Sequence, residues 1–520
     1  MVLTRRVFPA CARRRLPGHI GVMKGVTAPP GAGEARGLTM GNLCAEVHET
    51  HTGVVVLMGD HAFKAKKRLR TDFLDFSTAA LREQACRREV ELNRRLSPDS
   101  YLGVGHFQPP DGPAEPVIVM RRYPDSARLS THVRNGESVD EHLRAIAEKL
   151  ARFHRDAARG RSIDEEATAK ATAALWHQNL AELKTYAEVV IPQRSLDEVT
   201  RLADQFLAGR TELFERRISQ RRIVDGHGDL LSQDIFCMPD GPVLLDCLEF
   251  DDRLRYVDGV DDAAFLAMDL EFLGRGDLAD RFLDAYLDSA DDDAPRSLRD
   301  FYIAYRAVVR AKVDCIRVDQ GHDEALVDAR RHIEIALEHL KSGTVRLIIV
   351  GGGPGTGKTT VANALAHRVG AQVISTDEVR RELQAAGVIG GRVGELNAGL
   401  YAPENVSMVY DEVLRRAGVL LKHGWTVILD GTWRDGQQRE RAHRLGHQTS
   451  SPVVDFTCSL PLPAAAERIV ARGASTSDAT PEIAAALGEF VTAGRSHPLD
   501  TSRPLGDSLE EAQRICCLTI

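Results

Sequence analysis

The chain contains the nonapeptide Gly352-Gly353-Pro354-Gly355-Thr356-Gly357-Lys358-Thr359-Thr360. An apolar run, residues 345–350, precedes it, and a run of helical character, residues 361–369, follows. The nonapeptide fits G-x-x-x-x-G-K-[ST] between a strand and a helix, which is the pattern of a phosphate-binding loop. Backbone N–H groups of such a loop point inward and the helix N-terminus adds partial positive charge, so polyphosphate is held there. We therefore expect Lys358 to reach the β- and γ-phosphates and Thr359 to place its hydroxyl on Mg²⁺.

Composition places the chain among multidomain globular proteins. Its 520 residues predict two or three domains. The chain is 43% hydrophobic and 27% charged, with a mean hydropathy of −0.23. A net charge of −8 and a pI near 6.2 argue against nucleic acid or an anionic membrane as partner. No apolar run approaches the roughly 18–20 residues that span a bilayer. The nine cysteines are scattered without zinc spacing, which favours reduced thiols and a cytoplasmic location. Residues 1–40 are predicted to be a disordered tail.

The region after this tail combines strands with basic and acidic side chains. Residues 54–58 and 61–66 flank a Gly-Asp turn and read as a hairpin, which puts Lys64 and Lys66 on one face. A helix is predicted over residues 78–96, which include Glu89, and a strand over residues 116–120. Kinases use a strand lysine that faces a helix glutamate to orient ATP phosphates. The alternative is a pair of lysines that keep a sheet edge solvated.

A second hairpin lies in the middle of the chain and follows mostly helical sequence, in which one helix is predicted over residues 196–218. It is predicted from a strand over residues 235–238, a Pro-Asp-Gly turn and a return strand over residues 242–245. Asp234 precedes this hairpin, Asp246 follows it, and Asp229 lies shortly upstream, so we expect the three carboxylates to converge. Converging carboxylates repel unless a cation lies between them, which predicts a Mg²⁺ site. An acidic turn region without metal is the alternative.

The part that follows the phosphate loop has the signs of a parallel sheet. Strands are predicted over residues 372–375, 425–430 and 453–459. Ligands bind at the carboxyl ends of such strands, where Asp377 and Asp430 are expected. Asp430 is the candidate to support Mg²⁺ through water. Arg468 and Arg472, four residues apart on a predicted helix, can clamp a phosphate or simply face solvent.

The motif His227-Gly228-Asp229, with its hairpin ending in Leu245-Asp246, resembles the aminoglycoside phosphotransferase family of the protein-kinase-like fold. The resemblance covers residues 46–320 and implies that Asp229 acts on the substrate hydroxyl and that His227 braces the loop. It also implies that Asp246 binds metal, and that Lys64 (or, second, Lys66) and Glu89 serve the ATP phosphates. The family usually has Asn where this chain has Asp234, which can still bind Mg²⁺ but adds repulsion.

The last third resembles the small P-loop kinases of metabolites and nucleosides, of gluconate- and shikimate-kinase type and related AAA or zeta-toxin-like ATP-binding proteins. That resemblance covers residues 343–520. It implies that Asp377 contacts the acceptor and that Arg472 is the lid arginine. The predicted fold class is thus an α+β protein-kinase-like domain, residues 46–342, followed by an α/β parallel-sheet P-loop NTPase domain.

These features predict an ATP- and Mg²⁺-dependent phosphotransferase with two nucleotide sites that acts on a hydroxyl of a small molecule. The alternative is that the first domain is catalytically silent and regulates, or is regulated by, the P-loop domain. Asp234 motivates this alternative. The sequence predicts neither the acceptor nor the oligomeric state.

Overall fold

The structure is a computed structural model, and it describes residues 45–49, 53–70, 75–109, 112–392, 398–471 and 496–519. The predicted tail over residues 1–40 lies outside them. The described chain divides into two compact units. The first unit comprises the described residues up to Pro124 together with Leu245–Asp251, and the second comprises Asp125–Leu244 and the described residues of Asp252–Ile520. The domain boundary near residue 342 stays a prediction.

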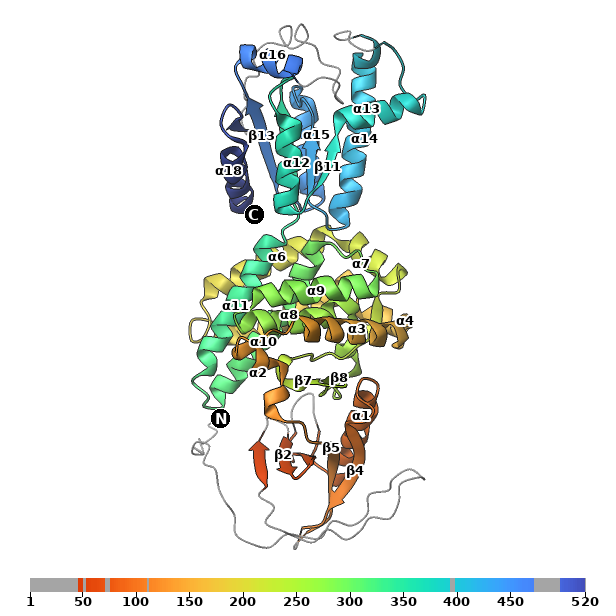
Figure 1. Cartoon of the computed structure of the whole chain (residues 1–520), viewed down its shortest axis with the longest axis vertical. Coiled ribbons are helices and arrows are strands. Elements are labelled where there is room, and N and C mark those ends of the chain that lie inside the picture. Colours follow the sequence, from red (N-terminus) through yellow and green to blue (C-terminus); the bar gives the residue numbers. More distant parts are fainter. Residues whose placement is uncertain are drawn as a thin grey trace. The chain divides into compact units, whose positions relative to one another are not determined.

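The first unit is an antiparallel sheet with one helix against it. The strand order is β1-β2-β3-β5-β4, and helix α1 lies along β4 and β5 (Figure 1). The bounds are β1 (Glu46–Glu49), β2 (Gly53–Met58), β3 (His61–Lys66), α1 (Ala79–Arg94), β4 (Tyr101–Phe107) and β5 (Glu115–Arg121). The predicted hairpin, helix and strand are confirmed. The prediction lacked β4, because its two glycines weaken the strand signal; one of them, Gly105, packs its backbone against Val119.

The second unit begins with helices and two short antiparallel pairs. The pairs are β6 (Ile223–Asp225) with β9 (Tyr256–Asp258) and β7 (Ile235–Met238) with β8 (Gly241–Leu244), and the second pair confirms the central hairpin. The helices are α2 (Leu129–Arg134), α3 (Asp140–Asp156), α4 (Arg161–Glu166), α5 (Ala169–Leu183), α6 (Gln193–Gly209), α7 (Thr211–Ser219), α8 (Gly259–Phe272), α9 (Gly276–Ala290), α10 (Arg296–Asp319) and α11 (Ala325–Ser342).

One long helix, expected over residues 196–218, is instead the pair α6 and α7. The break falls at Gly209, where a side chain would lie 2.2 Å from the backbone oxygen of Thr449. Arg210 follows with φ −126° and is fully buried. Its guanidinium donates to the carbonyls of Gly209 and Thr449, at 2.9 and 2.7 Å, and to Ser451 Oγ at 3.0 Å. This tertiary contact overrides a continuous helical pattern.

The second unit continues into a five-stranded sheet of order β11-β12-β10-β13-β14, in which every pairing is parallel. Its bounds are β10 (Leu347–Gly352), α12 (Lys358–Val369), β11 (Gln372–Ser375), α13 (Thr376–Ala385), α14 (Pro403–Lys422), β12 (Val427–Asp430), α15 (Gly436–Gln448), β13 (Val453–Ser459), α16 (Leu462–Ala471), β14 (His497–Asp500) and α18 (Leu505–Leu518). The predicted parallel sheet is confirmed, and β13 matches its predicted bounds. The strand β14 and the helix α18 were not predicted.

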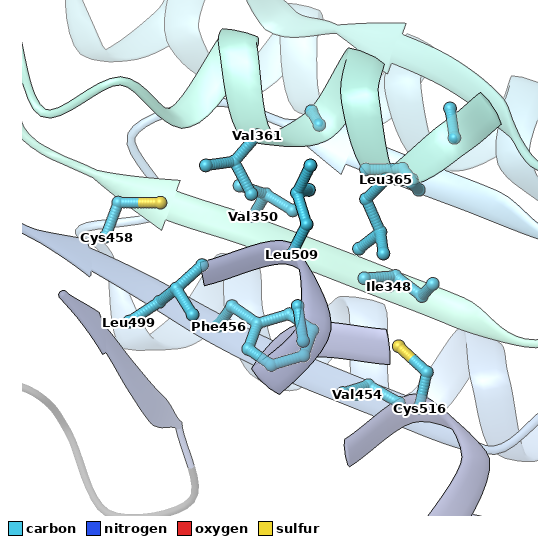
Figure 2. Close-up of a cluster of buried hydrophobic side chains, with 14 residues drawn as sticks. Ile348, Val350, Val361, Leu365, Val454, Phe456, Cys458, Leu499, Leu509 and Cys516 are labelled. Atoms are coloured by element: carbon cyan, nitrogen blue, oxygen red, sulfur yellow. The ribbon is translucent and has the colours of Figure 1, made fainter. Parts of the chain in front are cut away.

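The core of this sheet fixes the helix that follows the phosphate loop. Val361 and Leu365 of α12 face Ile348 and Val350 of β10, and Phe456 of β13 fills the space beside them (Figure 2). All of these side chains are at most 2% exposed. Burial of each stabilises the fold by about 1.5–3 kcal/mol. Because α12 is held in this way, the N-terminus of the helix stays at the carboxyl end of β10.

In the described part of the chain, no helix combines the length and the apolar character that a membrane crossing needs.

Candidate active site

The phosphate loop turns sharply between β10 and α12. Gly352, Gly355 and Gly357 have φ of 150°, 77° and 85°, values that side chains strain to adopt. A side chain at Gly355 would lie 2.4 Å from the backbone oxygen of Ala465 in α16. The loop therefore requires glycine for conformation and for space. Thr356 closes it, since its hydroxyl donates to the carbonyl of Gly353 at 2.8 Å.

Three strand ends meet beside this loop. The pairing places Asp430, the last residue of β12, opposite Val350 of β10 and opposite Ser375, the last residue of β11. Thr359 Oγ1, in the first turn of α12, donates to Asp430 Oδ2 at 2.8 Å. Asp430 is 2% exposed, and its Oδ1 has no hydrogen-bond partner among the described residues. Burial raises the pKa of Asp430, and nearby Lys358 and the Thr359 hydroxyl only partly offset this.

These residues fit a nucleotide with Mg²⁺. The glycine loop leaves a cradle that any side chain would fill, and Lys358 at the start of α12 supplies a cation that is 8% exposed. Asp430 Oδ1 and the Thr359 hydroxyl supply oxygen atoms of the kind that Mg²⁺ prefers. When bound, Mg²⁺ would neutralise charge on the β- and γ-phosphates. Lys358 and the helix N-terminus would hold the phosphates in place.

An acidic and a basic side chain flank the loop. Asp377, in the first turn of α13, accepts from Arg380 Nη1 at 2.6 Å, and Arg380 in turn lies 4.5 Å above the ring of Tyr401. Arg468 of α16 donates to the carbonyl of Thr501 at 2.9 Å. Its Nη1 lies 3.5 Å from where a side chain at Gly357 would begin, so its charge is beside the phosphate loop. Arg472, predicted as the lid arginine, lies outside the described residues.

The first unit holds two lysines on one glutamate. Lys64 Nζ lies 2.9 Å from Glu89 Oε1 and 2.5 Å from Asp246 Oδ1, and Lys66 Nζ lies 2.5 Å from Glu89 Oε2 and pairs with Glu249. Glu89 is fully buried. Burial alone would lower the pKa of Lys64, but Asp246 and Glu89 raise it well above its ordinary value. The predicted arrangement of a strand lysine facing a helix glutamate is therefore present, and Lys66 shares it.

The segment that carries Asp246 is tied to the same unit. Asp246 has φ 65°, unusual for a residue with a side chain, and its N–H donates to the Tyr101 hydroxyl at 3.2 Å. The next N–H, of Cys247, donates to Asn93 Oδ1 of α1 at 2.9 Å. These two bonds hold the Asp246 carboxylate toward Lys64. Glu249 three residues later, which the sequence reasoning missed, adds a third carboxylate to the cluster.

The His-Gly-Asp motif is held by a buried carboxylate of the second unit. Asp262, in the first turn of α8, accepts from the N–H of His227 at 2.7 Å and of Gly228 at 2.8 Å, and it bonds His154 Nε2 at 2.8 Å. Burial alone would raise the pKa of Asp262, but His154 and His227 lower it below its ordinary value. Asp229 follows, half-buried, with its N–H on His227 Nδ1 at 3.3 Å. The loop thus presents Asp229 from a fixed backbone, and the His227 ring accepts the N–H of Asp229. The bracing role of His227 stays a prediction.

The expected metal site of Asp229, Asp234 and Asp246 stays a prediction. Asp229 and Asp234 belong to the second unit and Asp246 to the first. Within the residues that the structure describes, no group of three or more His, Cys, Asp or Glu side chains has the arrangement of a metal site.

The comparisons with known proteins agree with this architecture. The chain is 55% identical over 472 residues to the uncharacterized protein Rv2004c of Mycobacterium tuberculosis, a match that covers 90% of this chain and 95% of that protein. The chain belongs to the Rv2004c family. The chain is also 30% identical over 129 residues to shikimate kinase of Corynebacterium diphtheriae, a match that covers 22% of this chain and 72% of that enzyme. The family model described as AAA domain matches residues 347–491.

A solved structure also matches most of this member of the Rv2004c family. The GDP and kanamycin complex of APH(2")-IIia covers 59% of this chain and 94% of that chain, with 15% identity and a TM-score of 0.38. The predicted fold class is confirmed to this extent: an α+β part with an antiparallel sheet precedes an α/β part with a parallel sheet and a P-loop. The AAA-domain match and the likeness to shikimate kinase indicate a phosphotransferase.

Three site residues were not predicted: Asp262, His154 and Glu249. Asp262 lies in the acidic run after the hairpin, which reads as solvated, and nothing local marks it as buried. His154 ends a helix 73 residues before the His-Gly-Asp motif. Only tertiary packing brings Asp262 and His154 together, and Glu249 to Lys66, so no spacing in the sequence could have signalled them.

Proposed function

We propose that this protein is an ATP- and Mg²⁺-dependent phosphotransferase whose P-loop site transfers the γ-phosphoryl group to a hydroxyl of a small metabolite. In the reaction the acceptor oxygen forms a bond to phosphorus, the bond to the leaving ADP oxygen breaks, and the hydroxyl proton passes to a base, for which the Asp377 carboxylate is the candidate. The observation that carries the proposal is the Thr359–Asp430 hydrogen bond at the mouth of the Lys358 loop. A glycine turn without nucleotide chemistry has no need of a buried carboxylate there.

The other residues take roles that follow from their positions. Lys358 draws charge from the β- and γ-phosphates, and Arg468 beside Gly357 stabilises the transferring group. Asp377 lies at the end of β11, where an acceptor would meet the γ-phosphate, and Arg380 fixes its carboxylate. Such catalysis is mainly positioning and charge neutralisation. The proposal leaves Arg472 as the lid arginine.

The test measures ATP loss by the full chain against a metabolite library with Mg²⁺ present. We expect Lys358→Ala to lower turnover by about 100-fold or more, because phosphate contacts of this kind are worth several kcal/mol in the transition state. The control is Lys422→Ala, which removes an exposed lysine that pairs with Glu212 on the surface. Equal turnover in both variants would overturn the proposal.

We propose in addition that the kinase-like part is a second transfer site. Asp229 would accept the proton of the acceptor hydroxyl, Lys64 and Glu89 would orient phosphates, and Asp234 and Asp246 would bind Mg²⁺. With Lys358→Ala in place, residual turnover should depend on Asp229 and should vanish in Asp229→Ala. The second unit's own loop supports this role, because Asp262 holds the backbone before Asp229.

The rival candidate is a catalytically silent kinase-like part that regulates the P-loop part. It is favoured by Asp234, which replaces the usual amide with a second charge beside the proposed cation. Asp234→Asn tests it, in the Lys358→Ala background. A rise in Mg²⁺ affinity or turnover identifies a working site that Asp234 tunes, whereas no turnover in either form supports the silent kinase.

A further inference from the structure

A cavity of about 390 Å³ lies in the second unit. Helices α3 and α9, which lie side by side (Figure 1), the end of α7 and the start of α8 surround it. Four of its lining residues are arginines: Arg155, Arg159, Arg221 and Arg222. Asp292 is the one carboxylate among the residues that line it.

The arginines outweigh this carboxylate. Arg217, which does not line the cavity, binds Asp292 through both of its terminal nitrogens, at 2.5 and 2.7 Å. Among the arginines that line the cavity, Arg222 is paired with Asp292, with its Nε 3.7 Å from Asp292 Oδ2. That Nε makes no hydrogen bond among the described residues. The terminal nitrogens of Arg222 bind the carbonyls of Ala290 and Asp291. Carbonyls position this guanidinium, and Asp292, which Arg217 already binds, offsets only part of its charge.

Arg159 is held in the same manner. It donates to the carbonyls of His154, Arg155, Ala157 and Arg221, at 2.6 to 3.0 Å. Burial, followed by the like charge of Arg221, lowers its pKa. The guanidinium groups around the cavity therefore repel one another, and an anion bound between them would reduce this repulsion.

Two of the arginines that line the cavity have side chains without a bonding partner among the described residues. The side chains of Arg155 and Arg221 are exposed and make no hydrogen bond or ion pair within the described residues. Arg221 also has φ 57°, a conformation that costs a bulky residue about 1 kcal/mol and that glycine or asparagine would adopt freely. Arg221 lines the cavity at this strained corner. Backbone strain of this kind clusters at ligand sites.

We propose that this arginine cavity binds the phosphate group of a small anionic ligand, separate from both transfer sites. Arginine presents forked donors that match phosphate oxygens, and the volume is at the small end of ligand pockets, about 300–1,000 Å³. Arg155 and Arg221 supply the free donors, and Arg159 and Arg222 supply fixed charge.

The cavity touches the network that holds the His-Gly-Asp loop. His154 and Tyr286 line it, and the two bond each other through Nδ1 and the hydroxyl at 2.7 Å. His154 also bonds Asp262, which accepts from the N–H groups of His227 and Gly228. A ligand that orders His154 therefore orders the backbone before Asp229. The cavity thus has the geometry of an effector site for the kinase-like part.

Hydrogen exchange of the full chain tests the proposal, with inorganic phosphate and glycerol 3-phosphate as probes in EDTA. The Lys358→Ala background weakens phosphate binding at the P-loop. We expect slower exchange over residues 154–160 and 219–223, extending to residues 226–230. A response to inorganic phosphate identifies the free anion as sufficient, and a response to glycerol 3-phosphate alone identifies a phosphate ester.

In the double variant Arg155→Ala with Arg221→Ala, the ligand concentration that gives half-maximal protection should rise about 10- to 100-fold. The reason is that each charged hydrogen bond contributes about tenfold or more to affinity. The matched control is Arg152→Ala with Arg161→Ala, which removes the same charge from nearby surface pairs with Glu148 and Glu165. Unchanged thermal unfolding shows that each variant folds. Protection by neither probe, or equal protection in the two double variants, would overturn the proposal.

Discussion

Replacing Asp430 by asparagine separates a functional carboxylate from a structural one. The amide keeps the size of the side chain, and its oxygen can still accept from the Thr359 hydroxyl, now 2.8 Å from Oδ2. What disappears is the negative charge at the carboxyl end of β12. If that charge supports Mg²⁺ through water, its loss should lower Mg²⁺ affinity about 10- to 100-fold, or about 1.4–2.7 kcal/mol.

Stability should move the other way. Burial raises the pKa of Asp430, so the ionised form costs the folded protein free energy at neutral pH. Asparagine removes that cost, and we expect the nucleotide-free variant to unfold at the same temperature or higher. Asp455, in strand β13 of the same sheet, is the matched control. It is also buried, and although burial alone would raise its pKa, His443 and Arg439 lower it.

Asp455→Asn should therefore destabilise the protein, by about 3 kcal/mol for a broken buried pair, and leave the Mg²⁺ requirement unchanged. The assays are thermal unfolding without ligand and nucleotide binding by calorimetry across a Mg²⁺ series. An Asp430→Asn protein that unfolds earlier and binds Mg²⁺-nucleotide as the parent does would refute the role given to Asp430.

Three further outcomes follow from the geometry. His339 bonds Glu271 and Asp300, and although burial alone would lower its pKa, these carboxylates raise it to about 9. Its contribution of about 3 kcal/mol should be complete below pH 6.5 and lost as pH rises to 9, and denaturant unfolding of His339→Gln should lack this pH dependence. Asp262→Ala should cost about 3–5 kcal/mol and speed hydrogen exchange at residues 226–230, whereas exchange confined elsewhere would argue against its bracing role. Gly355→Ala should strain the phosphate loop by about 1–3 kcal/mol and weaken nucleotide binding, because the new side chain would meet the Ala465 carbonyl. Unchanged nucleotide binding would show that α16 moves away to make room for the side chain.

The P-loop part could be predicted closely because its chemistry is local. Nine consecutive residues set both the turn and the phosphate cradle, and apolar runs on each side define β10 and α12. Asp430 could be found for a similar reason, because it ends a strand whose apolar run is unbroken. What the sequence did not contain was the position of Arg468, which depends on how α16 packs against Gly355.

The kinase-like part was predictable in its two hairpins and in β5, whereas β1, β4, β6 and β9 were not predicted, and its site was predicted only in part. The hairpin pattern put Lys64 and Lys66 on one face, and both reach Glu89. The helix break at Gly209 was missed, because a carbonyl far along the chain causes it. The same limit hid Asp262, whose role arises from burial against the His-Gly-Asp backbone. Buried charge is a tertiary property, and an acidic run in sequence does not reveal it.

Two lysines, Lys64 and Lys66, share Glu89, and their other partners indicate which of the two would bind the ATP phosphates. Lys66 is bound to Glu89 and Glu249 and is 6% exposed, so both of its partners are protein carboxylates in a buried site. Lys64 shares Glu89 but has Asp246 as its second partner, and that carboxylate is 44% exposed. A phosphate oxygen can replace an exposed carboxylate on a lysine at little cost, whereas it would have to displace a buried pair from Lys66. Glu89 can then hold Lys66 as a permanent counter-ion while Lys64 exchanges Asp246 for phosphate. This exchange would also free Asp246 for Mg²⁺, which ties the two roles predicted for these residues to one step.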